Sequence, residues 1–233
     1  MSFKRDARFT FVPYTIVLKT PLGCAVSFND VIIDRIAARL LSSPPPLAEA
    51  RHLVPDWSPP KPFDRPPVAA AVLIAIVARP EGPTVLYTER SPDLRSHSGQ
   101  VAFPGGKVDP SDRDAADAAL REANEEVALE RTDARILGFM PTYFTGTNYL
   151  ITPVVAAVTP SRPFVPNPGE VHSVFEVPLV RILSADSYGH FRFERGGQRG
   201  ETWQIDHDGH RIWGITANLT RMFRDLAAEE DAA

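Results

Sequence analysis

Three glutamates close together in the chain have the residue type and spacing to bind a divalent cation. They are Glu122, Glu125 and Glu126, and Arg121 precedes them. On a helix that turns about 100° per residue, Glu126 lies roughly 40° from Glu122 and Glu125 roughly 60° to its other side, so the carboxylates share one face. Such hard oxygen donors suit Mg²⁺ or Mn²⁺, which would offset their mutual repulsion. The alternative for a segment of this kind is a solvated acidic helix face.

The residues around the glutamates predict a helix from about Asp114 to Ala128. The segment 109–112, Asp-Pro-Ser-Asp, offers helix-starting chemistry, and the Pro104-Gly105-Gly106 turn comes before it. A second face of this helix carries an apolar stripe that we expect to pack on a sheet: Ala116, Leu120, Ala123 and Val127. The helix would therefore be held by its apolar face while its carboxylates face a site.

At these residues the sequence resembles the Nudix hydrolase signature. That signature runs Gly, five residues, Glu, seven residues, Arg-Glu, an aliphatic residue, any residue, Glu-Glu, any residue, Gly and an aliphatic residue. Six positions match: Gly106, Arg121, Glu122, Glu125, Glu126 and Leu129. Three departures occur: one extra residue lies between Gly106 and Arg121, Asp112 stands where the first Glu is expected, and Ala128 replaces the final Gly. Without glycine, a left-handed helix end is harder to form.

The resemblance implies a metal-dependent site built on this helix. It implies that Glu122, Glu125 and Glu126 hold Mg²⁺ or Mn²⁺ and that Arg121 orients one carboxylate, with Glu125 and Arg121 among the catalytic residues. It leaves Asp112 as a less certain contributor. It also implies an α/β fold, the Nudix α/β/α sandwich, in which a mixed β-sheet lies between helices.

The preceding segment, from Leu86 to Gly106, is similar to the extended motif of the coenzyme A diphosphatase branch of the Nudix hydrolases. A strand ending in Thr-x-Arg-Ser leads into Leu-Arg-x-His-x-Gly-Gln-Val-x-Phe-Pro-Gly-Gly, and the longer loop that follows is usual in this branch. The expected substrate-binding residues are Arg90, Arg95, His97, Lys107 and Gly106. Positive charge beside an acidic metal site suits a substrate with several phosphates. The alternative is a solvated loop with incidental charge.

A further acidic residue, Glu170, lies in the loop Asn167-Pro168-Gly169-Glu170-Val171. A carboxylate delivered from a loop opposite the metal helix could bind another cation or take a proton from water. We therefore include it among the catalytic candidates. A surface glutamate without a role is the competing interpretation.

The rest of the chain predicts a domain over 68–230 preceded by an extension over 1–67. Strands are expected over 68–78, 84–88, 136–141 and 152–158, a hairpin over 198–213, and a closing helix over 214–228. The segment 175–183 reads as strand, helix or one of each. The extension contains an amphipathic helix near 31–41 and a proline-rich linker over 43–68 that excludes helix and inner strand.

Composition limits the location and partners of the chain. Its 233 residues carry 25 Lys and Arg against 29 Asp and Glu, so there is no diffuse basic field for nucleic acid. We find no apolar run of membrane-spanning length and no secretory signal, and the one cysteine, Cys24, agrees with a reducing compartment. We expect a cytoplasmic protein that binds a small molecule and not nucleic acid or membrane. A homodimer is one option.

Together these features predict hydrolysis of the diphosphate of coenzyme A or acyl-coenzyme A to 3′,5′-ADP and (acyl-)4′-phosphopantetheine. One alternative is a Nudix diphosphatase for another nucleoside diphosphate derivative, such as ADP-ribose or a dinucleotide. The other is a catalytically silent nucleotide-binding module that keeps the acidic helix as structure.

Overall fold

The computed structural model describes residues 18–19, 25–26, 28–45, 63–94, 97–195 and 198–228. Cys24, Arg95 and most of the proline-rich linker therefore lie outside the described residues. Residues 63–67 enter the domain without regular secondary structure.

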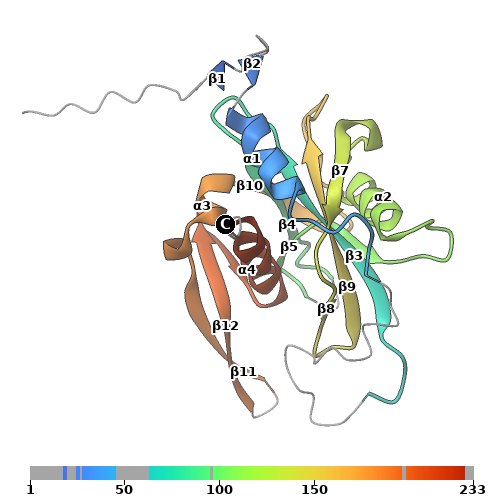
Figure 1. Ribbon diagram of the computed structural model, residues 1–233. Helices are drawn as coiled ribbons and strands as arrows, with labels where there is room; N and C mark the ends of the chain where they lie inside the picture. Colours follow the sequence, from blue (N-terminus) through green and yellow to red (C-terminus); the bar gives the residue numbers. More distant parts are fainter. Residues whose placement is uncertain are drawn as a thin grey trace, which may run out of the picture.

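A mixed sheet forms the centre of the molecule (Figure 1). Its main path runs β10-β4-β3-β9-β7, and three short strands, β5, β6 and β8, pair with β4, β3 and β9. The strands of this sheet are β3 Val68–Val77, β4 Thr84–Arg90, β5 Val101–Ala102, β6 Gly105–Lys107, β7 Ala134–Phe139, β8 Tyr143–Phe144, β9 Tyr149–Val158 and β10 Val171–Pro178. The β3–β9 pair is parallel and the other pairs are antiparallel. The near-continuous apolar runs of β3 and β9 suit central strands that are covered on both faces.

Helices cover the two faces of this sheet, which makes the predicted α/β/α sandwich (Figure 1). On one face lies α2, Ala115–Val127, whose Ala119, Ala123 and Val127 are fully buried with residues of β3 and β9. On the other face lies α4, Ile215–Ala228, whose Leu219 and Phe223 join a second apolar core. Each helix buries one apolar stripe, as its sequence pattern predicts.

The C-terminal part contains a strand that the sequence did not reveal. β11 Gly189–Arg195 pairs with β12 Gln198–His207, which pairs with β13 His210–Trp213 in a separate three-stranded sheet. The segment left open in the sequence is one of each type, since β10 ends at Pro178 and the short helix α3, Leu179–Leu183, follows. Single 3₁₀ turns lie at Arg131–Asp133 and Ala185–Ser187.

The helix expected before the linker is α1, Phe28–Ala37. Its Ile33 and Ile36 are buried in the same core as α4, and Leu41 exchanges two backbone hydrogen bonds of 2.9 Å with Phe139 of β7. Ahead of it, β1 Leu18–Lys19 pairs with β2 Ala25–Val26. The helix therefore packs on the same domain as the sheet, while the division into 1–67 and 68–230 stays a prediction.

Candidate active site

The ends of α2 are set by local contacts. Asp114 is the N-cap, and its side chain accepts a 2.8 Å hydrogen bond from the backbone N–H of Asp117. At the other end Ala128 adopts a left-handed conformation, with φ 56°, and its N–H donates to the carbonyls of Ala123 and Asn124. The helix therefore ends in the left-handed conformation that the final glycine of the signature usually provides, although alanine occupies the position.

The three glutamates of α2 differ strongly in exposure. The side chain of Glu126 is 3% exposed, that of Glu122 is 16% exposed and that of Glu125 is 53% exposed. Glu122 and Glu126 lie one helical turn apart on the side of α2 that faces the Gly105-Gly106 turn. These two carboxylates form the protected centre of the site, and Glu125 lies at its solvent edge.

Glu126 is a buried carboxylate with two polar neighbours. It accepts a 3.2 Å hydrogen bond from the backbone N–H of Gly105, and its Oε1 lies 4.0 Å from an Nη1 of Arg90. Burial raises the pKa of Glu126 to about 8, and the nearby charges of Glu122 and Glu170 act in the same direction. A cation placed here would reverse that shift, because it would stabilise the ionised form.

Glu122 lies against the backbone of Gly106. A Cβ at residue 106 would come within 2.5 Å of the Cδ of Glu122, so only glycine leaves room for this carboxylate. Burial raises the pKa of Glu122, and Arg121, whose Nη1 is 3.0 Å from its Oε1, opposes that shift. The glycine at residue 106 thus has a steric basis in this molecule.

Arg121 connects the carboxylates to the loop before the helix. Its Nε and Nη2 bind the two carboxylate oxygens of Asp112 at 2.9 and 3.0 Å, and Nη2 also donates to the carbonyl of Lys107 at 3.1 Å. Its Nη1 lies 3.1 Å from an oxygen of Glu125. Asp112, whose side chain is 3% exposed, therefore anchors Arg121, a role that the sequence alone did not indicate.

Glu170 is brought to the same site by the loop between β9 and β10. The backbone carbonyl of Glu170 accepts a 2.9 Å hydrogen bond from the N–H of Ser91, which follows Arg90. The charge on Glu170 contributes to the raised pKa values of Glu122 and Glu126. Glu170 itself is exposed.

The expected substrate-binding residues occupy different positions around these acids. Arg90 ends β4 beside Glu126, and its buried Nε has no hydrogen-bond partner within the described residues. His97 has a left-handed backbone, with φ 58°, and its Nδ1 lies 2.8 Å from Oε1 of Gln100. Lys107 is exposed at the end of β6. Arg95 lies outside the described residues.

The donor set fits a divalent cation in its chemistry. Glu122 and Glu126 supply oxygen donors whose raised pKa values reflect burial near like charge, a condition that bound Mg²⁺ or Mn²⁺ relieves. In the part of the chain that the structure describes, no three His, Cys, Asp or Glu side chains are gathered closely enough to hold a metal ion. Glu122 and Glu125 instead share the guanidinium of Arg121.

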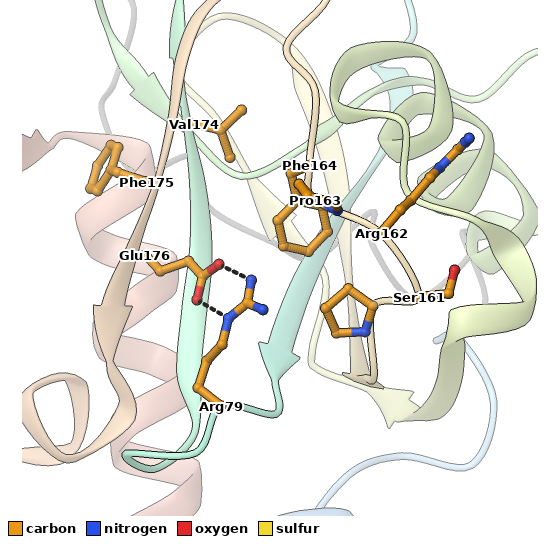
Figure 2. A pocket seen from close by; sticks show the side chains of 9 residues that line it. Arg79, Ser161, Arg162, Pro163, Phe164, Val174, Phe175 and Glu176 are labelled. Carbon is orange, nitrogen blue, oxygen red and sulfur yellow. Dashed lines mark hydrogen bonds and ion pairs between the residues drawn. The ribbon is translucent and has the colours of Figure 1, made fainter.

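A separate pocket of about 620 Å³ lies at the edge of the sheet (Figure 2). Arg79 and Glu176 meet in it through an Nε–Oε2 hydrogen bond of 3.0 Å, and the loop residues Ser161 to Phe164 form the facing wall. None of the acidic candidates lines this pocket.

Across the residues described, no helix is both long and apolar enough to cross a membrane.

Comparison with known proteins identifies the family. The NUDIX domain model matches residues 67–194. An uncharacterized Nudix hydrolase, NudL, of Photorhabdus laumondii is 43% identical over 150 residues, which cover 64% of this chain and 80% of the relative. NudL of Escherichia coli is 43% identical over 152 residues, which cover 65% of this chain and 79% of the relative.

Among solved structures, a Nudix hydrolase from M. smegmatis, RenU, is similar to this chain with a TM-score of 0.42 and 22% sequence identity. The similarity covers 52% of this chain and 76% of that protein. The family model and the NudL relatives, together with the acidic helix and its glycine turn, show that this chain belongs to the Nudix family and is a Nudix hydrolase acting on a nucleotide derivative.

Proposed function

We propose that this enzyme hydrolyses the diphosphate bond of coenzyme A or acyl-coenzyme A, releasing 3′,5′-ADP and (acyl-)4′-phosphopantetheine. One observation carries the proposal: the segment that resembles the coenzyme A motif is joined directly to the acidic site. Arg90 lies 4.0 Å from Glu126, and the loop after it returns to the Arg90 backbone, which bonds to Gln100 at 3.0 Å and Gly99 at 3.2 Å. Motif and catalytic helix therefore form one site.

The proposed metal residues are Glu122 and Glu126, with Glu125 as the third; Glu125 contacts Arg121 in this structure and would have to turn toward the other two to share an ion with them. Nudix hydrolases generally use divalent ions such as Mg²⁺ or Mn²⁺, which neutralise charge on phosphate oxygens and lower the pKa of water. In this chain Arg121 would hold Glu122 and Glu125 in place through its contacts of 3.0 and 3.1 Å. Glu170, at the open side of the site, would bind a further cation or take the proton of the attacking water.

The proposed substrate residues supply positive charge to the phosphates. Arg90 has a buried Nε without a partner in the described chain, and a phosphate oxygen would satisfy it through a charge-assisted hydrogen bond. Lys107, His97 and Arg95 belong to the segment that precedes the acidic helix. Gly106 would contribute its backbone, while the carboxylate of Glu122 fills the space that a side chain at residue 106 would need. Coenzyme A suits this set because it carries a diphosphate and a separate 3′-phosphate.

The test is a product assay with Mg²⁺, Mn²⁺ or EDTA on coenzyme A, acetyl-coenzyme A, dephospho-coenzyme A, ADP-ribose and a dinucleotide. We expect metal-dependent release of 3′,5′-ADP, with the highest kcat/KM for a coenzyme A species that retains the 3′-phosphate. A higher kcat/KM for ADP-ribose or the dinucleotide would contradict the coenzyme A assignment. It would favour a diphosphatase for another nucleoside diphosphate derivative.

A matched pair of arginine variants tests the link between motif and site. Arg90→Gln is expected to lower kcat/KM about 100-fold, because it removes a charged phosphate donor. Arg79→Gln changes an arginine just after β3, one that is bound to Glu176, and should leave kcat/KM unchanged. Equal losses in both variants would show a general effect on the fold instead of a role in the site.

A further inference from the structure

The loop between β9 and β10 is attached to the last turn of the catalytic helix. The N–H of Val165 donates to the carbonyl of Val127 at 3.0 Å, and the N–H of Asn167 donates to the carbonyl of Glu126 at 2.9 Å. The last carbonyls of a helix have no partner within the helix, so this loop satisfies two of them. The loop thus meets the backbone of the same residue whose side chain is buried in the site.

Asn167 also begins the tight turn that carries Glu170. Its carbonyl accepts hydrogen bonds from the N–H of Glu170 at 2.9 Å and of Val171 at 2.8 Å. Its side-chain Oδ1 accepts one from the N–H of Gly169 at 3.2 Å, the Asx-turn contact that preorganises such a turn. Pro168 restricts the backbone between these contacts. Four hydrogen bonds to Glu126, Gly169, Glu170 and Val171 therefore converge on this one residue.

The far end of the turn is held as well. The carbonyl of Glu170 accepts the N–H of Ser91 at 2.9 Å, next to Arg90. Arg90 in turn lies 4.0 Å from the carboxylate of Glu126, so the Glu170 turn is tied at both ends to residues that contact Glu126 or belong to its backbone. The separation between Glu170 and Glu126 depends on a short chain of contacts that runs through Asn167.

We propose that Asn167 is a positioning residue, which fixes the carboxylate of Glu170 relative to Glu126 by joining the Glu170 turn to the end of α2. This inference rests on the proposed roles of Glu126 and Glu170 in catalysis. The backbone of Asn167 makes the connection to the helix, and its side chain holds the turn in shape. Asn167 acts through Glu170 and is not itself a catalytic residue.

The test is a double-mutant cycle of Asn167→Ala and Glu170→Gln with kcat and KM measured separately. Loss of the Asx contact should lower kcat about tenfold with KM changed less than about twofold, because a misplaced catalytic group slows chemistry more than binding. Asn167→Ser, whose hydroxyl accepts the same bond more weakly, should recover about half of the loss on a logarithmic scale. In the Glu170→Gln background, Asn167→Ala should change kcat less than about twofold.

A second measurement does not depend on turnover. Moving the charge of Glu170 away from Glu122 and Glu126 should weaken Mn²⁺ binding, titrated directly, by about threefold. Asn167→Ala should show this weakening with Glu170 present and lose it in the Glu170→Gln background. Equal weakening of Mn²⁺ binding in both backgrounds would overturn the proposal. An Asn167→Ala effect on kcat of the same fold with Glu170 and with Gln at position 170 would overturn it as well.

Asp133→Ala is the matched control at the other end of the loop. Asp133, in the 3₁₀ turn before β7, accepts two 2.8 Å hydrogen bonds from the loop residue Ser161, which lines the pocket of Figure 2. Asp133→Ala should loosen that end of the loop and leave kcat unchanged. A fall in kcat equal to that of Asn167→Ala would overturn the proposal. If coenzyme A is not the substrate, the cycle is run on the compound that the panel identifies, so the two proposals fail separately.

Discussion

The carboxylate of Glu122 lies directly on the backbone of Gly106, with no space between them for a side chain. A Cβ at residue 106 would be 2.5 Å from the Cδ and 2.8 Å from the Oε2 of Glu122. Gly105 is confined in the same way, since its Cβ would be 2.7 Å from the Cα of Val72 in β3. The two glycines therefore allow α2 to place its acids against the sheet.

Gly106→Ala should displace Glu122 and lower kcat by about 100-fold, because a shift of about 1 Å in a positioned group can cost that much. Unfolding free energy should fall by about 1–3 kcal/mol from the overlap. Kinetics and urea unfolding measure both. Gly189→Ala is the control, since its Cβ would meet Gln204 at an ordinary 3.6 Å, and it should keep full activity. Unchanged kcat in Gly106→Ala would refute the steric argument.

Asp112→Asn should release Arg121 from the loop before α2. The two hydrogen bonds of 2.9 and 3.0 Å would lose their charge assistance, so we expect about tenfold lower kcat and about 1–3 kcal/mol lower stability. Asp117→Asn is matched to it, because Asp117 also binds two arginine side chains. Its Oδ1 lies 2.7 Å from Arg113 and 2.7 Å from Arg131. This variant should cost stability only. A similar fall in kcat for both variants would argue against a specific role for Asp112.

The buried Glu126 predicts a pH-dependent stability in EDTA. Its pKa is raised from 4.5 to about 8 in the folded protein, so the neutral form stabilises the fold below pH 4.5. That contribution is lost as the pH rises from 4.5 to about 8, with a total of about 2–4 kcal/mol. Urea unfolding at several pH values should show a smaller decline for Glu126→Gln than for the parent protein.

Glu125→Gln provides the control for this titration, because Glu125 is 53% exposed on the same helix. Its stability profile should follow that of the parent protein between pH 5 and pH 8.5. The burial argument would be wrong if Glu126→Gln retained the parent slope while Glu125→Gln removed it.

Ala128→Gly should stabilise the protein by about 0.5–1 kcal/mol, since Ala128 has φ 56° and glycine adopts this conformation without steric cost. Ala116→Gly, inside α2, should destabilise it by about 1 kcal/mol through the lower helix propensity of glycine. Thermal unfolding separates the two, and neither change should alter kcat. Destabilisation by both substitutions would mean that the strain at Ala128 is absent.

The sequence by itself was sufficient for features that depend on neighbouring residues. The helix expected over 114–128 is observed as Ala115–Val127, because its cap, its apolar stripe and its end all lie within one short segment. The strands expected over 68–78 and 84–88 are β3 and β4, whose apolar runs reflect burial on both faces. β11 was missed, since its short polar and aromatic sequence forms a strand by pairing with β12.

Tertiary structure decided how similar residues differ in chemistry. Glu122, Glu125 and Glu126 are equivalent in the sequence motif, yet packing leaves their side chains 16%, 53% and 3% exposed. The contacts that set their environments come from outside the helix: Gly105 and Asn167 bind Glu126, and Asp112 holds Arg121. Desolvation and charge depend on which groups surround a carboxylate in space, so the roles of these acids arise only when the sheet, the helix and the loops are packed together.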